Sequence, residues 1–170
     1  LLDLGDIHFA EGLAERALGD YQEGKKIAHE NEDQDMITPL SLSLPELYMI
    51  QGHLRAARSG LEEVLKSLAD SGDAFYVSTA HKHSADLESR MGAFSEANSH
   101  IGEAEKTAES LQNQSLIGSV LLTRAEIRAR EMRPDEARGD FKKAQGIAKA
   151  INNPAMAVQA RLGNALEMGL

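Results

Sequence analysis

The chain has no cysteine and no tryptophan, and aromatic residues make up only 4% of its 170 positions. The absence of cysteine excludes disulfide bonds and thiolate metal sites. No apolar run approaches the roughly 20 residues that a membrane-spanning helix requires. The sequence begins Leu1-Leu2-Asp3, with no methionine and no signal-like region. We therefore expect a cytoplasmic protein and a fragment of a longer chain.

The overall composition favours helices and an acidic surface. A core with so few aromatic residues must be built from alanine, leucine, isoleucine and methionine, which suits closely packed helices and argues against a β-sandwich. Acidic residues outnumber basic ones by 27 to 18, so the formal net charge is −9. A surface of that sign repels phosphate backbones and anionic lipids. We expect no direct contact with nucleic acid or membrane.

An internal repeat of forty residues organises the sequence. Gly12, Gly52 and Gly92 are spaced by this period, and Met132 stands at the fourth equivalent position. After each of them, small, large and small residues follow at spacings of four and three, which is one face of an α-helix. These residues are Ala17, Tyr21 and Gly24; Ala57, Leu61 and Val64; Ala97, Ile101 and Ala104; and Ala137, Phe141 and Ala144. Each unit is predicted to be a helix, a tight turn and a second helix.

Polar, turn-prone stretches set the expected helix boundaries. The predicted first helices lie near 1–11, 36–51, 74–91 and 115–131, and the second helices near 14–30, 54–70, 94–110 and 134–150. A ninth helix begins near 154. We expect one solenoid domain over 1–170, with units 1–33, 34–73, 74–113 and 114–153 and a partial fifth unit 154–170.

The second unit carries two prolines, Pro39 and Pro45, inside its predicted first helix. An interior proline costs about 3 kcal/mol, and Ser43 with Glu46 matches a capping box, a pattern typical of helix starts. A kinked or late-starting helix is predicted here, and a proline tolerated with a mild bend is the alternative.

The repeat resembles the tetratricopeptide repeat family over nearly the whole chain. The matching positions read Gly5, Gly12, Ala17, Tyr21, Gly24; Pro45, Gly52, Ala57, Leu61, Val64; Ala85, Gly92, Ala97, Ile101, Ala104; and Ala125, Met132, Ala137, Phe141, Ala144. The period is forty where the family standard is thirty-four, and the family's early tryptophan and late proline are absent. These features are most similar to divergent repeats of large bacterial signalling proteins, including transcription activators and nucleotide cyclases. The resemblance implies an all-α, right-handed superhelical solenoid of about nine helices in antiparallel pairs, with the first helices lining a concave groove.

Within that groove the resemblance implies a carboxylate in every unit: Asp6, Glu46, Asp86 and Glu126. One interpretation is an acidic row that attracts lysine or arginine side chains of a peptide. The other is that local pairs neutralise the row, because Arg90 and Arg130 follow Asp86 and Glu126 by four residues. The remaining candidate groove residues are mixed in character: Phe9, Leu42, Met49, Lys82, Arg90 and Leu122.

No catalytic motif is present in the sequence. His81 and His83 are two residues apart, whereas metal-binding pairs on a helix are three or four apart, so we expect neither a metal nor a cofactor. The leading hypothesis is a non-catalytic scaffold that binds a peptide or protein segment in its groove. An effector-sensing segment of a larger ATPase-type regulator and a structural or oligomerisation element are the alternatives. Apolar residues in the last helix also suggest a homodimer contact through the terminal helices.

Overall fold

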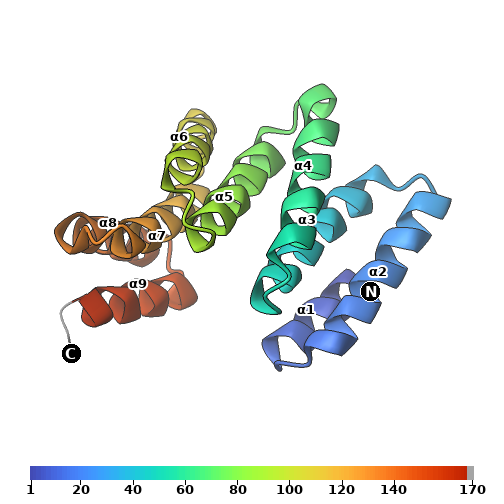
Figure 1. Ribbon diagram of the computed structural model, residues 1–170, viewed down its shortest axis with the longest axis horizontal. Coiled ribbons are helices and arrows are strands. Elements are labelled where there is room, and N and C mark those ends of the chain that lie inside the picture. The colour runs from blue at the N-terminus through green and yellow to red at the C-terminus, as the bar shows by residue number, and fades with distance from the viewer. Residues whose placement is uncertain (168–170) are drawn as a thin grey trace. The chain divides into compact units, whose positions relative to one another are not determined.

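The structure is a computed structural model, and it describes residues 1–167 apart from the side chains of residues 70, 71 and 167 (Figure 1). This part of the chain forms nine α-helices and no strand. The helices are α1 (Leu2–Ala10), α2 (Ala14–Glu30), α3 (Gln34–Ile50), α4 (Leu54–Ser71), α5 (Ala74–Arg90), α6 (Phe94–Ser110), α7 (Gln114–Arg130), α8 (Pro134–Ala150) and α9 (Pro154–Glu167). The all-α class is confirmed, and the predicted helix boundaries agree with the structure to within about two residues. None of these helices combines the length and the apolar character needed to cross a membrane.

A period of twenty residues underlies the repeat of forty. From α2 onward, every helix begins twenty residues after the previous one. Two residues before each start, one residue adopts a left-handed backbone conformation, with φ between 52° and 79°. These residues are Gly12, Glu32, Gly52, Gly72, Gly92, Gln112, Met132 and Asn152. The turns within each unit therefore share one design, and they bring consecutive helices together as antiparallel neighbours.

The helix starts fall into two classes. The first helices α3, α5, α7 and α9 follow Asp33, Asp73, Asn113 and Asn153, whose side chains accept hydrogen bonds from backbone N–H groups of the first turn. Such caps are each worth about 1 kcal/mol. The second helices α2, α4, α6 and α8 follow Leu13, His53, Ala93 and Arg133, which make no side-chain cap bond. Packing and the tight turn therefore position the second helices.

The predicted late start of the helix containing Pro39 and Pro45 is wrong. Helix α3 runs without interruption from Gln34 to Ile50 through both prolines. The capping-box interpretation is wrong as well, because Ser43 lies inside the helix and donates its Oγ–H to the Pro39 carbonyl at 3.2 Å. Packing offsets the hydrogen bonds that the prolines lack. Pro45 is buried, and a Cβ added to Gly60 of α4 would lie only 3.0 Å from the Pro45 ring.

The chain divides into two compact units, Leu1–Gly72 with α1 to α4 and Asp73–Leu170 with α5 to α9. In the first unit, Tyr21 packs against α1 where Gly5 leaves room for its ring, since a Cβ at Gly5 would lie 2.3 Å from the ring edge. In the second unit, Phe141 is packed in the same way against Gly163 of α9, also at 2.3 Å. The small–large–small stripes are buried in both units. Antiparallel helix pairs packed in series are thus confirmed within each unit. The single solenoid domain and its right-handed superhelical path stay predictions.

Candidate binding surface

In the second unit, the predicted groove residues of α5 and α7 form an ion-pair network around Asp86. The Asp86 carboxylate accepts from Arg90 Nε at 2.9 Å and from Arg130 Nη1 at 2.8 Å. Arg130 also donates to Ser89 Oγ at 2.7 Å. This network neutralises Asp86, one of the four carboxylates of the predicted acidic row, as the local-pair interpretation expects. The pairing of Asp86 with Arg130 also joins α5 to α7.

Glu126 is less fully neutralised than Asp86. Its carboxylate lies 3.7 Å from Arg130 Nη2, and its side chain is 51% exposed. Partial desolvation raises the pKa of this carboxyl, and the negative charge of Asp86 raises it further, while Arg130 acts in the opposite direction. Glu126 therefore keeps an accessible side chain, and its ion pair with Arg130 is longer than those of Asp86.

An open pocket of about 490 Å³ lies between α7 and α9. We call it the α7–α9 pocket. Glu126 and Arg130 are its charged residues, and the others are Leu122, Ala129, Phe141, Gln159, Leu162, Gly163 and Leu166. Leu162 and Leu166 are 61% and 75% exposed, although both are apolar. The pocket is therefore an apolar concavity with a carboxylate and a guanidinium among its lining groups.

The candidate residues of the first unit are arranged differently. Asp6 accepts a hydrogen bond from the Tyr21 hydroxyl at 2.7 Å. Burial raises the pKa of that hydroxyl above its ordinary value, and the charges of Asp6 and Glu46 raise it further. Leu42 and Met49 are each 5% exposed, so they belong to the interior of the first unit.

The other candidates are intermediate in exposure. Phe9 of the first unit is half-buried and packs on the Tyr21 cluster, and Lys82 of α5 is half-buried. Two of the candidate residues, Leu122 and Glu126, line the α7–α9 pocket. Two others, Asp86 and Arg90, are paired in the ion-pair network around Asp86.

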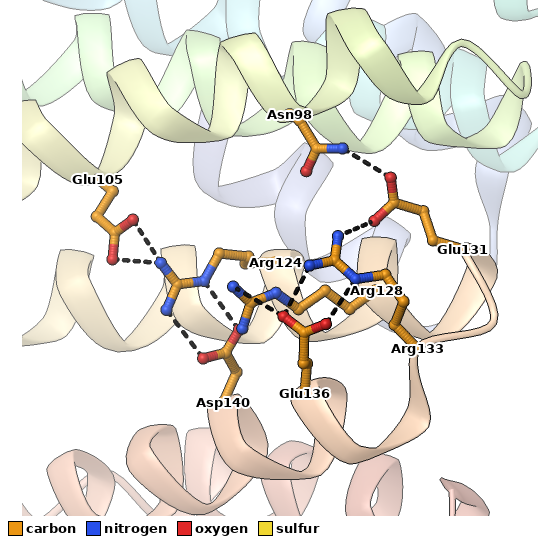
Figure 2. Close-up of polar contacts among 8 residues, drawn as sticks. All are labelled: Asn98, Glu105, Arg124, Arg128, Glu131, Arg133, Glu136 and Asp140. Carbon is orange, nitrogen blue, oxygen red and sulfur yellow. Dashed lines mark hydrogen bonds and ion pairs between the residues drawn. The ribbon is translucent and has the colours of Figure 1, made fainter.

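A second ionic cluster connects α6, α7 and α8 (Figure 2). Arg124 donates through Nε and Nη2 to the two oxygens of Asp140, both at 2.8 Å, and through Nη1 to Glu105. Arg128 donates to Asp140 at 2.6 Å. Asp140 is only 1% exposed, and its hydrogen bonds are the main reason that the pKa of Arg124 is raised. A buried carboxylate bound by two guanidinium groups fixes the three helices against one another.

The edge of this cluster is exposed. Arg133 donates to Glu136 and Glu131, and Glu131 accepts from Asn98 of α6 at 2.7 Å (Figure 2). Exposed pairs of this kind contribute little to stability.

Sequence reasoning missed the cluster of Arg124 and Asp140, although the repeat contained a signal for it. Forty, eighty and one hundred and twenty residues before Arg124 stand Ser84, Leu44 and Leu4, so a guanidinium appears at this position only in the fourth unit. When only one unit of a repeat carries a charged residue at a position that is apolar or small in the other units, that residue indicates an oppositely charged side chain nearby that the other units lack.

The histidines form pairs that their spacing did not predict. His81 of α5 and His100 of α6 have their Nδ1 atoms 2.8 Å apart, and His8 Nδ1 lies 2.6 Å from Asp20 of α2. Burial and the neighbouring His100 lower the pKa of His81, and burial lowers that of His83 to about 3. Among the residues that the structure describes, no group of three or more histidine and acidic side chains is arranged to hold a metal ion.

Comparison with known proteins supports the fold and does not assign a family. No protein-family model matches the chain, and no curated protein matches it. A solved structure, BtubC (BKLC) from P. vanneervenii, is similar with a TM-score of 0.74 and 23% sequence identity over 98% of this chain and 69% of that one. At this identity the likeness shows a common helical fold.

Proposed function

We propose that the chain is a non-catalytic protein-interaction module that binds a peptide segment of a partner in the α7–α9 pocket. The observation that carries this proposal is the pocket itself, an apolar concavity of about 490 Å³ lined mainly by residues of the first helices α7 and α9. Exposed apolar side chains in an open pocket are typical of protein-binding sites.

The charges of the pocket support a ligand that combines an apolar anchor with a basic side chain. The apolar anchor packs on Leu162 and Leu166, and the lysine or arginine pairs with the half-exposed carboxylate of Glu126. The net charge of −9 attracts a basic ligand at long range. Asp86 contributes less, because Arg90 and Arg130 already neutralise it.

We further propose that the chain is a divergent member of the tetratricopeptide repeat family. The forty-residue recurrence of the turn glycines supports this placement, as does the burial of a small–large–small stripe in each second helix. Two features of this chain are particular to it: the twenty-residue spacing of all helix starts and the absence of tryptophan.

A peptide-display selection followed by quantitative binding tests the proposed pocket. Selected peptides should combine basic and apolar residues, and Glu126→Lys should weaken their binding at least tenfold by reversing the charge at the pocket. Leu166→Glu should do the same by placing a charge on the apolar wall. The matched control is Glu109→Lys, which reverses an exposed charge on α6 away from the pocket. Equal binding by all variants would refute the assignment of the pocket.

A further inference from the structure

One exposed face of α8 departs from the charge pattern of the repeat. In the other repeat units, the second helix carries an exposed glutamate followed three residues later by an exposed lysine, a spacing at which opposite charges attract on a helix. These residues are Glu23 and Lys26, Glu63 and Lys66, and Glu103 and Lys106. In α8, Lys143 stands in place of the glutamate and Gly146 in place of the lysine. The fourth unit therefore reverses the charge and also removes its partner.

Two more lysines extend this basic surface. Lys142 precedes Lys143, and Lys149 follows Gly146 by three residues, at positions where no other unit has a lysine. All three lysines are exposed. The acidic residues of α8 are already engaged elsewhere, since Asp135 pairs with Arg138, Glu136 with Arg133, and Asp140 with Arg124. The lysines are therefore not neutralised by their own helix.

Two glycines leave this surface flat. Each of the three lysines lies three or four residues from Gly139 or Gly146, so the five residues form one stripe along α8. We call this stripe the α8 basic face. A Cβ added at either glycine would meet no atom within 4 Å. Glycine is a poor helix former, and here, unlike at Gly5 and Gly163, no described side chain occupies the space that it leaves. Close approach by another molecule would offset that cost.

We propose that the α8 basic face binds an acidic helix of a partner protein. The backbone of the partner helix passes over the two glycines, and its carboxylates pair with the three lysines. Glycines seven residues apart, about two helical turns, let two helices approach more closely than larger side chains would. Complementary charges across such a contact give specificity and speed association. This surface is separate from the α7–α9 pocket, which none of the five residues lines.

A further repeat unit would not cover the α8 basic face. The equivalent faces of α2 and α6 are exposed at Glu23, Lys26, Glu103 and Lys106. Each of these helices is nevertheless followed by another helix pair within its own compact unit. Successive repeat units thus pack on other faces of the second helices, and this face is left to a separate molecule.

An acidic protein helix fits this face better than a nucleic acid or a second copy of the chain does. The net charge of −9 repels a continuous polyanion, whereas a short helix can place its carboxylates at the three lysines alone. Two copies of the chain repel one another for the same reason. The outer stripes of α2, α4 and α6 also carry a lysine one turn after each glutamate, so a second copy offers no purely acidic stripe there.

A synthetic acidic helix is the probe that tests the proposal. It is an alanine-based peptide of about 18 residues with glutamates at spacings of three and four along one face, and a side-chain cross-link on the opposite face holds it helical, because an isolated helix of this length is marginal in water. Fluorescence anisotropy should show saturable binding to the intact chain. The same peptide with glutamine in place of glutamate should bind at least about tenfold more weakly, because it lacks the charges that pair with the lysines.

Charge reversal locates the binding on the chain. Lys142→Glu combined with Lys143→Glu should weaken binding of the glutamate peptide at least about tenfold. The matched control combines Lys25→Glu with Lys26→Glu on α2, which changes the net charge by the same amount. At physiological ionic strength this control should change binding by less than about twofold, because salt screens distant charges.

Gly146→Lys separates close approach from simple charge attraction. It restores the residue that the other units have at this position and adds a positive charge, so charge attraction alone would strengthen binding. Close approach of the helices instead predicts binding at least about fivefold weaker, because the new side chain stands between them. Thermal unfolding should show no loss of stability in this variant, since lysine is a better helix former than glycine. Glu126→Gln should leave binding unchanged, which distinguishes this face from the α7–α9 pocket.

The proposal is overturned by any of five results. The glutamate and glutamine peptides bind alike, or the two double variants behave alike, or Gly146→Lys strengthens binding. A DNA duplex at equal concentration displaces the peptide, or light scattering shows a dimer of the chain that Lys142→Glu with Lys143→Glu dissociates. The last two results would identify a nucleic acid or a second copy as the occupant of the face.

Discussion

Helices α7 and α9 occupy the same position in successive units, yet their corresponding faces have different surroundings. On α7, α8 covers Ala125 completely, and Arg124 finds carboxylates on both neighbouring helices. On α9, the equivalent alanine lines an open pocket, and the equivalent Asn164 has an oxygen without a described partner. The repeat thus places an alanine at the same position in both helices, and the residue directly before it differs, with Arg124 on α7 and Asn164 on α9.

The largest expected effect is at the covered face. Asp140→Ala should lower the free energy of unfolding by about 3 kcal/mol, because it leaves Arg124 and Arg128 facing a buried site without their shared carboxylate. Chemical denaturation measures this loss. Asp135→Ala removes an 87% exposed carboxylate from the same helix and should change the stability by no more than about 0.5 kcal/mol.

Position 164 of α9 provides the counterpart of the Arg124 position. Asn164→Leu should cost nothing or stabilise the chain by about 1 kcal/mol, because it removes an unsatisfied buried oxygen. Equal losses from Asp140→Ala and Asn164→Leu would contradict the contrast between the two faces.

The next effect concerns how α9 is held. Gly163→Val should destabilise the chain by about 2 kcal/mol, since a Cβ at this position would lie 2.3 Å from the Phe141 ring. Gly139→Ala in α8 is the control, because no atom lies within 4 Å of the new Cβ and the site is exposed. Alanine at that site should stabilise the helix by about 0.5–1 kcal/mol. Thermal unfolding should show a lower midpoint for Gly163→Val and a higher one for Gly139→Ala. An unchanged midpoint for Gly163→Val would show that α9 packs more loosely than described.

An effect of similar size depends on pH. His83 occupies on α5 the position that Gly163 has on α9, and burial lowers its pKa to about 3 from an ordinary value of 6.5. Below pH 6.5 the unfolded chain takes up a proton that the folded chain does not, so stability falls as the pH drops from 6.5 toward 3. His83→Gln should reduce the loss between pH 7.5 and 5 by about 2 kcal/mol. His29→Gln, at an exposed site on α2, should not alter the pH profile of unfolding, and a parallel reduction there would refute the role of burial.

The smallest effect lies in the turn between α7 and α8. Met132 adopts φ of 61° where the other units have Gly12, Gly52 and Gly92. Met132→Gly should stabilise the chain by about 0.5–1 kcal/mol by relieving the left-handed conformation of a residue with a side chain. Gly92→Ala should destabilise it by a similar amount. The denaturation midpoints of Met132→Gly and Gly92→Ala, each compared with that of the unchanged chain, test both expectations. Midpoint shifts of the same sign in the two variants would contradict a common turn design.

The sequence predicted the helices well because the repeat samples each element four times. Helix boundaries, turn positions and the buried stripe all follow from residues that recur in each unit, such as Gly12 and Ala17. Because each position is seen several times, one atypical residue in a single unit does not change the prediction. Sequence reasoning missed the shorter period of twenty residues. Its signal lay in the capping residues Asp33, Asp73, Asn113 and Asn153, which lie midway between the turn positions of successive units and precede alternate helices.

The candidate site was less predictable, because its residues depend on contacts between helices. The pairing of Asp86 with Arg90 follows from their spacing of four, but the pairing with Arg130 needs the packing of α5 on α7. Leu42 and Met49 matched the groove pattern and are nevertheless buried, since periodicity identifies a face and not what covers it. Pro39 and Pro45 show the same limit, as packing overrides the local preference against an interior proline.

The most direct test is to map a peptide selected by display onto the chain by NMR, through backbone amide shifts in the presence and absence of the peptide. The proposed function predicts shifts concentrated at Glu126, Ala129, Leu162 and Gly163 around the α7–α9 pocket, with that of Glu109 on α6 unchanged. Shifts spread evenly along the helices, or absent from the residues of this pocket, would contradict it.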